Sequence, residues 1–216
     1  NVVGLDQGEK IAAVLPKKED GNGYIVIATK KGLIKKTTTD EYSRIMKNGK
    51  IAVKLNEGDE IISVQFTTGD NELLIASRSG KCIRFHESNI RAMGRLAAGV
   101  RAMRLGENDA LVDMLVVDEN YDILTLTAKG YGKRTNVDDY RVQGRAGKGI
   151  KAGTFNEKTG ELVAMKQVTD ENDIMIITTA GTIIRMHADS ISRIGRASRG
   201  VRVMNVKDSL VATVDV

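Results

Sequence analysis

An internal repeat of about fifty residues is the strongest constraint on how this chain folds. Short β-rich runs each end in a glycine, and these glycines are spaced by 48, 50 and 51 residues: Gly32, Gly80, Gly130 and Gly181. A second glycine series follows at steps of 50, 50 and 51 residues: Gly49, Gly99, Gly149 and Gly200. Self-similarity at a fixed period of this size is typical of an array of equivalent supersecondary units.

Each repeat carries about four runs of alternating apolar and polar residues, joined by turns rich in Gly, Asn and Asp. Helical periodicity is weak throughout. A four-stranded unit that recurs every 40 to 50 residues predicts an all-β fold built of β-propeller blades. An irregular β-sandwich is the alternative, and it is disfavoured because independent landmarks share one period.

A third landmark is a strand with a leading aliphatic residue, which occurs five times, whereas the other landmarks occur four times. Its copies begin at Ile11, Ile61, Leu111, Leu162 and Leu210. We therefore expect a single partial domain over 1–216, with about four blades plus the end of a preceding one whose front half lies upstream. The expected repeats are 1–20, 21–70, 71–119, 120–171 and 172–216.

Composition narrows the functional classes. The 216 residues are 41% hydrophobic, with one Pro, one Cys and no Trp, which excludes a disordered chain, a disulfide scaffold and a Cys-rich zinc module. A lone Cys82 indicates a reducing compartment. No apolar run approaches the roughly 20 residues of a membrane span, so we expect a cytoplasmic protein with no membrane partner.

Positive charge is concentrated in one segment of each repeat. The net charge is only +5, yet four windows without Asp or Glu hold 16 of the 33 Lys and Arg residues. The rest of the chain holds the other 17 cations and all 28 acidic residues, so it carries a net charge of −11. These basic windows are 44–54, 91–104, 141–151 and 193–202.

Equivalent loops of propeller blades lie at successive points around one ring, so the basic windows predict a curved band of positive potential. Duplex DNA fits such a band. Aromatic residues make up only 4% of the chain, which disfavours single-strand binding by base stacking, and no base-reading motif is present. Gly94-Arg95, Gly144-Arg145 and Gly195-Arg196 place a guanidinium beside a flexible backbone, which suits phosphate contact. The predicted DNA-binding residues are Arg44, Lys47, Lys50, Lys54, Arg91, Arg95, Arg101, Arg104, Arg141, Arg145, Lys148, Lys151, Arg193, Arg196, Arg199 and Arg202.

No catalytic or metal constellation is expected. His86 and His187 occupy equivalent positions in different repeats, and Cys82 has no neighbouring dyad partner. Carboxylates fall mostly in turns, where a solvated role is the usual one. We therefore expect no catalysis by this chain alone, no cofactor and no metal.

Several motifs are similar to those of a known family. They are Gly-Tyr-Gly-Lys-Arg-Thr at 130–135, Asp139-Tyr140-Arg141, Gln143-Gly-Arg-Ala-Gly-Lys-Gly149 and the Gly-Val-Arg segments at 99–101 and 200–202. With these, essentially the whole chain resembles the C-terminal domain of DNA gyrase A. The resemblance implies a six-bladed β-pinwheel, whose blades exchange strands and whose basic rim wraps duplex DNA. It also implies that the remainder of gyrase A, and through it gyrase B, are partners in a bacterial, nucleoid-associated, ATP-dependent type II topoisomerase that introduces negative supercoils.

Alternatives remain at this point. The family's Gln-Arg-Arg-Gly-Gly-Arg-Gly box is not in this sequence, and 143–149 is a degenerate form of it. The equivalent domain of topoisomerase IV shares the blade and is the close alternative. A propeller whose basic rim docks an acidic protein tail is another. A propeller hydrolase would need convergent carboxylates, which the sequence does not show.

Overall fold

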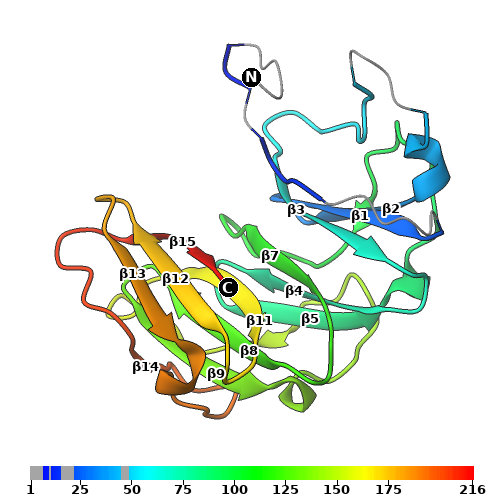
Figure 1. Ribbon diagram of the computed structural model, residues 1–216. Coiled ribbons are helices and arrows are strands. Elements are labelled where there is room, and N and C mark those ends of the chain that lie inside the picture. Colours follow the sequence, from blue (N-terminus) through cyan, green and yellow to red (C-terminus); the bar gives the residue numbers. More distant parts are fainter. Residues whose placement is uncertain (1–6, 10, 16–21, 45–48) are drawn as a thin grey trace.

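The computed structural model describes residues 7–9, 11–15, 22–44 and 49–216, which form four antiparallel sheets. Three sheets have four strands and the last has three. Figure 1 shows the sheets following one another around a common centre, as the blades of a propeller do. The predicted all-β, propeller-like fold class is confirmed.

Each repeat contributes three long strands to its own sheet. The first strands are β1 (Tyr24–Thr29), β4 (Glu72–Ser77), β8 (Asp122–Thr127) and β12 (Asp173–Thr178). The second strands are β2 (Leu33–Thr38), β5 (Lys81–His86), β9 (Tyr131–Asn136) and β13 (Ile183–His187). The third strands are β3 (Ile61–Thr67), β7 (Leu111–Val116), β11 (Leu162–Val168) and β15 (Val211–Asp215). Short 3-10 helices follow the second strands: η1 (Thr39–Tyr42), η2 (Glu87–Asn89), η3 (Val137–Asp139) and η4 (Ala188–Ser190).

The fourth strand of each complete sheet comes from the next repeat. These two-residue strands are β6 (Val100–Arg101), β10 (Ile150–Lys151) and β14 (Val201–Arg202). β6 pairs with β2, β10 with β5 and β14 with β9, all antiparallel. Each basic window of the second, third and fourth repeats therefore closes the outer edge of the preceding blade.

Three glycines of the second series, Gly99, Gly149 and Gly200, are explained by this exchange. A Cβ at Gly149 would lie 2.3 Å from the carbonyl oxygen of Cys82, and one at Gly99 would lie 2.6 Å from that of Ile34. Gly149 also has a φ of +68°, in the left-handed region. Since the backbones of the fourth and second strands nearly touch here, only glycine fits.

The strand order fixes which residues face outwards. In the first sheet the order is β3-β1-β2-β6, and the next two complete sheets follow the same plan. The third strands lie toward the centre, where β3 contacts β7, β7 contacts β11 and β11 contacts β15 (Figure 1). The short fourth strands are therefore the outermost strands of their blades.

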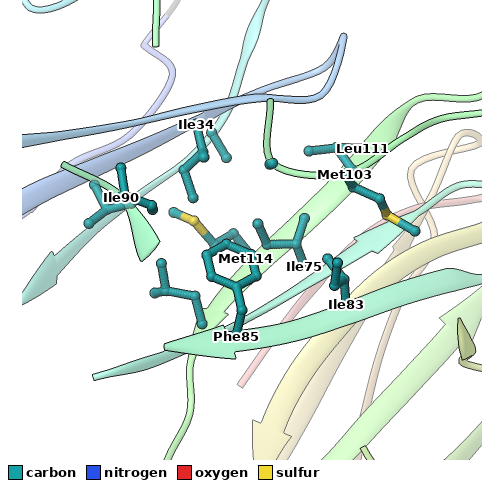
Figure 2. Close-up of a cluster of buried hydrophobic side chains, with 12 residues drawn as sticks. Ile34, Ile75, Ile83, Phe85, Ile90, Met103, Leu111 and Met114 are labelled. Atoms are coloured by element: carbon teal, nitrogen blue, oxygen red, sulfur yellow. The ribbon is translucent and has the colours of Figure 1, made fainter. Parts of the chain in front are cut away.

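Apolar packing couples adjacent blades. One buried cluster combines Ile34 of β2, Phe85 of β5 and Leu111 of β7 with Met103, which follows β6 (Figure 2). Full burial of each such side chain contributes about 1.5–3 kcal/mol relative to exposure. The cluster draws on two repeats, so an isolated repeat could not bury the same surface.

One predicted strand is wrong. We expected a strand beginning at Ile11, but residues 11–15 have no regular secondary structure, and Ile11 and Val14 are 59% and 82% exposed. The equivalent third strands pair with the first strand of their own repeat, and none of the described residues before Tyr24 forms such a strand. Residues 1–6, 10 and 16–20 of the expected repeat lie outside the described residues.

The last sheet shows what the exchanged strand does. Among the described residues, no strand pairs with the outer edge of β13. Ile183 is 60% exposed there, whereas Ile34, at the equivalent position of β2, is fully buried. The Arg185 side chain is 72% exposed, against 6% for the equivalent Arg84. Burial of each second strand thus depends on the following repeat.

We expect Gly149→Ala to destabilise the fold by about 2–4 kcal/mol, because the added Cβ pushes β10 away from β5. The matched control is Gly49→Ala. Gly49 has a φ of +71° but no described atom within 4 Å of a Cβ, so only backbone strain of about 1 kcal/mol applies. Urea unfolding followed by circular dichroism measures both. Equal losses would show that the close approach at Gly149 is unimportant.

Candidate nucleic-acid interface

The exchanged strands bring cations to equivalent points on the rim. Arg101 lies on β6, Lys151 on β10 and Arg202 on β14, and all three side chains are exposed. Because these strands are the outermost of three successive blades, the three cations follow one curved line. The structure thus places the exchanged strands of the second, third and fourth basic windows on the rim, and their contact with DNA stays a prediction.

The sixteen predicted cations fall into two groups by exposure. The exposed residues are Arg44, Lys54, Arg91, Arg101, Arg104, Arg141, Lys148, Lys151, Arg193, Arg199 and Arg202. The half-buried residues are Lys50, Arg95, Arg145 and Arg196. Lys47 lies outside the described residues. Arg193 pairs with Asp122 at 2.6 Å, and Arg202 bonds to Tyr131. The other nine exposed cations form no side-chain hydrogen bond or ion pair with another described residue.

The arginines of the Gly-Arg turns link neighbouring repeats. Arg145 donates from Nε to the carbonyl oxygen of Asn89 at 3.1 Å and from Nη1 to that of Arg101, both in the preceding repeat. Arg196 makes the two equivalent bonds one repeat later. Through these hydrogen bonds, each guanidinium group holds the basic window of its own repeat against the preceding repeat.

Arg95 has a related role in the first pair of blades. Its Nη1 donates to the carbonyl oxygen of Ile51 at 2.9 Å, and its Nε lies 3.5 Å from a Glu41 carboxylate oxygen. We predicted these three arginines as phosphate contacts. One or two N–H groups of each guanidinium bond within the protein, so these arginines also position the rim, and phosphate contact through their remaining N–H groups stays a prediction.

Two buried lysines beneath the rim were missed by sequence reasoning. Lys35 and Lys133 are the third residues after their glycines, where the other two repeats carry Ile83 and Ile184. Both ammonium groups donate to backbone carbonyl oxygens of the basic windows. A lysine at a position that is isoleucine in alternate repeats was the signal that could have revealed them.

Burial lowers the pKa of both lysines to about 8, and the charges of nearby arginines act in the same direction. For Lys133 the arginine is Arg196, and for Lys35 it is Arg95. At pH 7 both groups therefore remain mainly protonated. Their positive charges lie against the backbone of the basic windows.

Tyr131 supports Arg202 at the rim. The guanidinium carbon lies 5.4 Å from the ring centroid, and Nη2 donates to the phenolic oxygen at 3.2 Å. This hydrogen bond lowers the pKa of Tyr131, with the charge of Arg202 contributing to the same effect. The pair holds one rim cation in a defined position.

The histidines and the cysteine have structural surroundings. Nε2 of His86 lies 3.1 Å from a carboxylate oxygen of Asp70, and Nδ1 of His187 lies 2.9 Å from one of Asp173. The two histidines belong to different sheets. Burial raises the pKa of Cys82 to about 12, so it is not a nucleophile at neutral pH. Across the described residues, no group of three or more His, Cys, Asp or Glu side chains could hold a metal ion, and no helix could cross a membrane.

Comparison with known proteins places this geometry in a family. The family described as DNA gyrase C-terminal domain, beta-propeller, matches four successive segments of the chain: 23–68, 71–118, 121–169 and 172–216. The chain belongs to this family. The four matched segments correspond to the four sheets.

Individual relatives agree with the assignment. The DNA gyrase A protein of Halalkalibacterium halodurans is 52% identical over 221 residues, which cover 100% of this chain and 26% of that protein. A solved gyrase A C-terminal domain superposes with a TM-score of 0.88 at 26% identity, over 99% of this chain and 72% of its own. A solved topoisomerase IV C-terminal domain superposes with a TM-score of 0.90 at 25% identity, over 97% of this chain and 67% of its own. The chain spans about a quarter of the length of the gyrase A proteins it matches.

We expect Arg145→Ala to lower the free energy of unfolding by about 1–3 kcal/mol, because two carbonyl oxygens lose their donors at the interface between repeats. Arg141→Ala is the matched control in the same window. Arg141 is exposed and bonds to no other described side chain, so its loss should change stability by less than about 0.5 kcal/mol. Thermal and urea unfolding measure both. A neutral Arg145→Ala variant would contradict the linking role.

Proposed function

We propose that this chain binds duplex DNA along its outer rim and bends it across successive blades. The observation that carries the proposal is the repetition of Arg101, Lys151 and Arg202 on the outermost strands, within windows that lack acidic residues. Duplex DNA carries about one negative charge per 1.7 Å of axis, so a curved row of cations suits its backbone. Sixteen cations in the four windows supply enough charge for several phosphate contacts.

The surroundings of the windows support duplex over single-stranded DNA. Single-strand sites stack bases on exposed aromatic rings. Tyr140, at the edge of one window, is fully buried, and Tyr131 is also buried beneath Arg202. Contact through phosphates rather than bases also favours binding with little dependence on sequence.

Family membership extends the proposal to the longer protein. We propose that the chain is the DNA-wrapping domain of a gyrase A protein, acting in the bacterial cytoplasm at the nucleoid. The remainder of gyrase A, together with gyrase B, would then carry out the ATP-dependent type II topoisomerase reaction. Bending a 20–30 bp site costs about 1–6 kcal/mol, which contacts distributed over several blades offset. A bend of fixed direction would return the duplex to the catalytic domains so that the two DNA segments always cross with the same handedness. Negative supercoiling requires such a fixed handedness.

The affinity for DNA should depend steeply on salt. If about half of the eleven exposed rim cations contact phosphate, log K should fall with log[salt] with a slope of about −5. Fluorescence anisotropy with a labelled duplex of mixed sequence measures this slope, and end-to-end energy transfer on the same duplex should report bending. A slope shallower than about −2, or a duplex that stays straight when bound, would contradict the proposal.

Removing the cations on the outer strands should distinguish the contribution of the rim to DNA binding from that of the overall net charge. The triple variant Arg101→Ala, Lys151→Ala, Arg202→Ala should make the salt slope shallower by about 3 and weaken all duplex sequences alike. The matched control removes three solvent-accessible cations outside the windows that pair with carboxylates: Lys30, Arg78 and Arg185. Equal weakening by the two triple variants would show that net charge, rather than the rim, attracts DNA.

Two alternatives differ from this proposal in testable ways. The topoisomerase IV likeness leaves open which of the two enzymes the chain serves, and a Gln-Arg-Arg-Gly-Gly-type box in the native sequence upstream of Asn1 would favour gyrase. An acidic protein tail is the second alternative. Duplex DNA should displace a poly-glutamate peptide from the rim easily if DNA is the ligand, and poorly if the tail is.

A further inference from the structure

A hollow beside Tyr131, at the junction of the third and fourth repeats, is lined by four cations. Its volume is about 360 Å³, within the roughly 300–1,000 Å³ that is typical of small-ligand sites. The third repeat contributes Lys129 and Lys158, and the fourth contributes Arg202 of β14 and Lys207. Only Arg202 belongs to a basic window, so the hollow extends the positive surface beyond the windows.

The charge of the hollow is not neutralised within the protein. Among the described residues that line it, Asp208 is the only acid. In the part of the chain that the structure describes, neither Asp208 nor any other carboxylate forms an ion pair with one of the four cations. Lys129 donates to the backbone carbonyl oxygen of Glu157, which carries no charge. Like charges gathered without a counter-ion repel one another, so a bound anion would relieve this repulsion.

Tyr131 shows that cations from both repeats lie close to one point. The guanidinium carbon of Arg202 lies 5.4 Å from the ring centroid, and Nη2 donates to the phenolic oxygen at 3.2 Å. That hydrogen bond lowers the pKa of Tyr131, and the charges of Arg202, Lys158 and Arg199 lower it further. The phenolic oxygen therefore lies in a region of positive potential to which both repeats contribute.

The corresponding turns of the first two repeats carry a carboxylate. There Asp59 or Asp109 accepts a hydrogen bond at 2.9 Å from the amide just before the turn glycine. In the third repeat that amide, of Lys129, donates instead to the backbone carbonyl oxygen of Thr159 at 3.2 Å. A neutral residue next to Lys158 thus replaces the aspartate, which makes this turn more positive than its equivalents.

Lys207 occupies a backbone conformation that does not favour lysine. Its φ is +50°, in the left-handed region. The same turn of the other three repeats places Gly58, Asn108 and Gly160 in that region, and Gly and Asn adopt it most readily. Strained residues of this kind are often found at functional sites. Lysine gives the turn no conformational advantage, so its contribution is its charge at the hollow.

We propose that this hollow binds one phosphate group, with Lys158, Arg202 and Lys207 as the charged donors. Hydrogen bonds between a cation and an anionic oxygen are about twice as strong as neutral ones, and several such donors around one hollow suit a phosphate. The DNA backbone and free phosphorylated compounds both carry this group. For a DNA phosphate the inference rests on the proposed function and extends the duplex contact beyond the basic windows.

Amide chemical shifts test the site directly. An ¹⁵N-labelled sample of the chain at pH 7 would be titrated with inorganic phosphate in one arm and with a short duplex of mixed sequence in the other. With phosphate, the amides of Lys158 and Lys207 should shift and saturate, and by more than those of the control turn 106–109. Chloride at the same ionic strength should not reproduce these shifts. Shifts no larger than in the control turn, or equal shifts with chloride, would overturn the inference.

Charge removal supplies a second test. The double variant Lys158→Ala, Lys207→Gly should weaken phosphate binding about tenfold. The matched control Lys30→Ala, Arg78→Ala removes two cations that pair with Glu60 and Glu161, and it should leave phosphate binding unchanged. Equal losses in the two double variants, or no loss in the first, would contradict the inference.

The single variant Lys207→Gly separates lost charge from lost fold. Glycine accepts the left-handed backbone at this position, so the melting temperature should stay the same or rise while phosphate binding weakens. Thermal unfolding and the phosphate titration measure the two effects. A variant that keeps its full phosphate affinity would show that Lys207 is not a donor.

The two titrations separate this inference from the proposed function. Phosphate that does not shift the amides of Lys158 and Lys207 would reject the site, whatever the duplex does. If phosphate shifts these amides and the duplex shifts them too, the DNA backbone supplies the phosphate. If the duplex binds without shifting them, the site takes a free phosphorylated compound and rim binding stands. A duplex that does not bind at all would reject the proposed function and leave the phosphate site standing.

Discussion

Each complete blade of this protein is closed by a strand from the following repeat, and most other features of the structure depend on that pairing. The pairing requires glycine where two backbones nearly touch, as at Gly149 against Cys82. It also buries the second strand, as the contrast between Arg84 and Arg185 shows. Because adjacent repeats share both hydrogen bonds and apolar clusters, a single repeat lacks the contacts that stabilise it in the array.

The same pairing decides where the positive charge lies. A fourth strand added to the outer side of a sheet is exposed on its far edge, so cations on β6, β10 and β14 stand on the rim. The windows also supply the arginines that link repeats, such as Arg145 and Arg196. Each basic window therefore both links neighbouring repeats and presents cations to solvent. The half-buried arginines make the links, and the exposed cations lie on the rim.

The repeats are less uniform than their common period suggests. Lys35 and Lys133 hold rim carbonyls in the first and third repeats, while Ile83 and Ile184 take the same position in the second and fourth. This alternation gives the rim a two-repeat pattern of buried charge. The rim turns are therefore of two kinds, one held from below by a lysine and one packed against an isoleucine.

The sequence by itself determined the period, the all-β class and the four basic windows, because strand alternation, turn glycines and charge are local properties of the chain. Ile11 was predicted as a strand for the same reason and is not one, since a strand needs a partner that local pattern does not supply. Resemblance implied that blades exchange strands, yet local pattern does not say to which sheet a short strand such as Val100–Arg101 adds. Only the tertiary structure decided which carbonyls Arg145 reaches, why Gly49 is free of the contact made at Gly149, and that Lys133 lies beneath a rim turn. These depend on contacts between residues more than forty positions apart, which form only when the repeats pack around one centre.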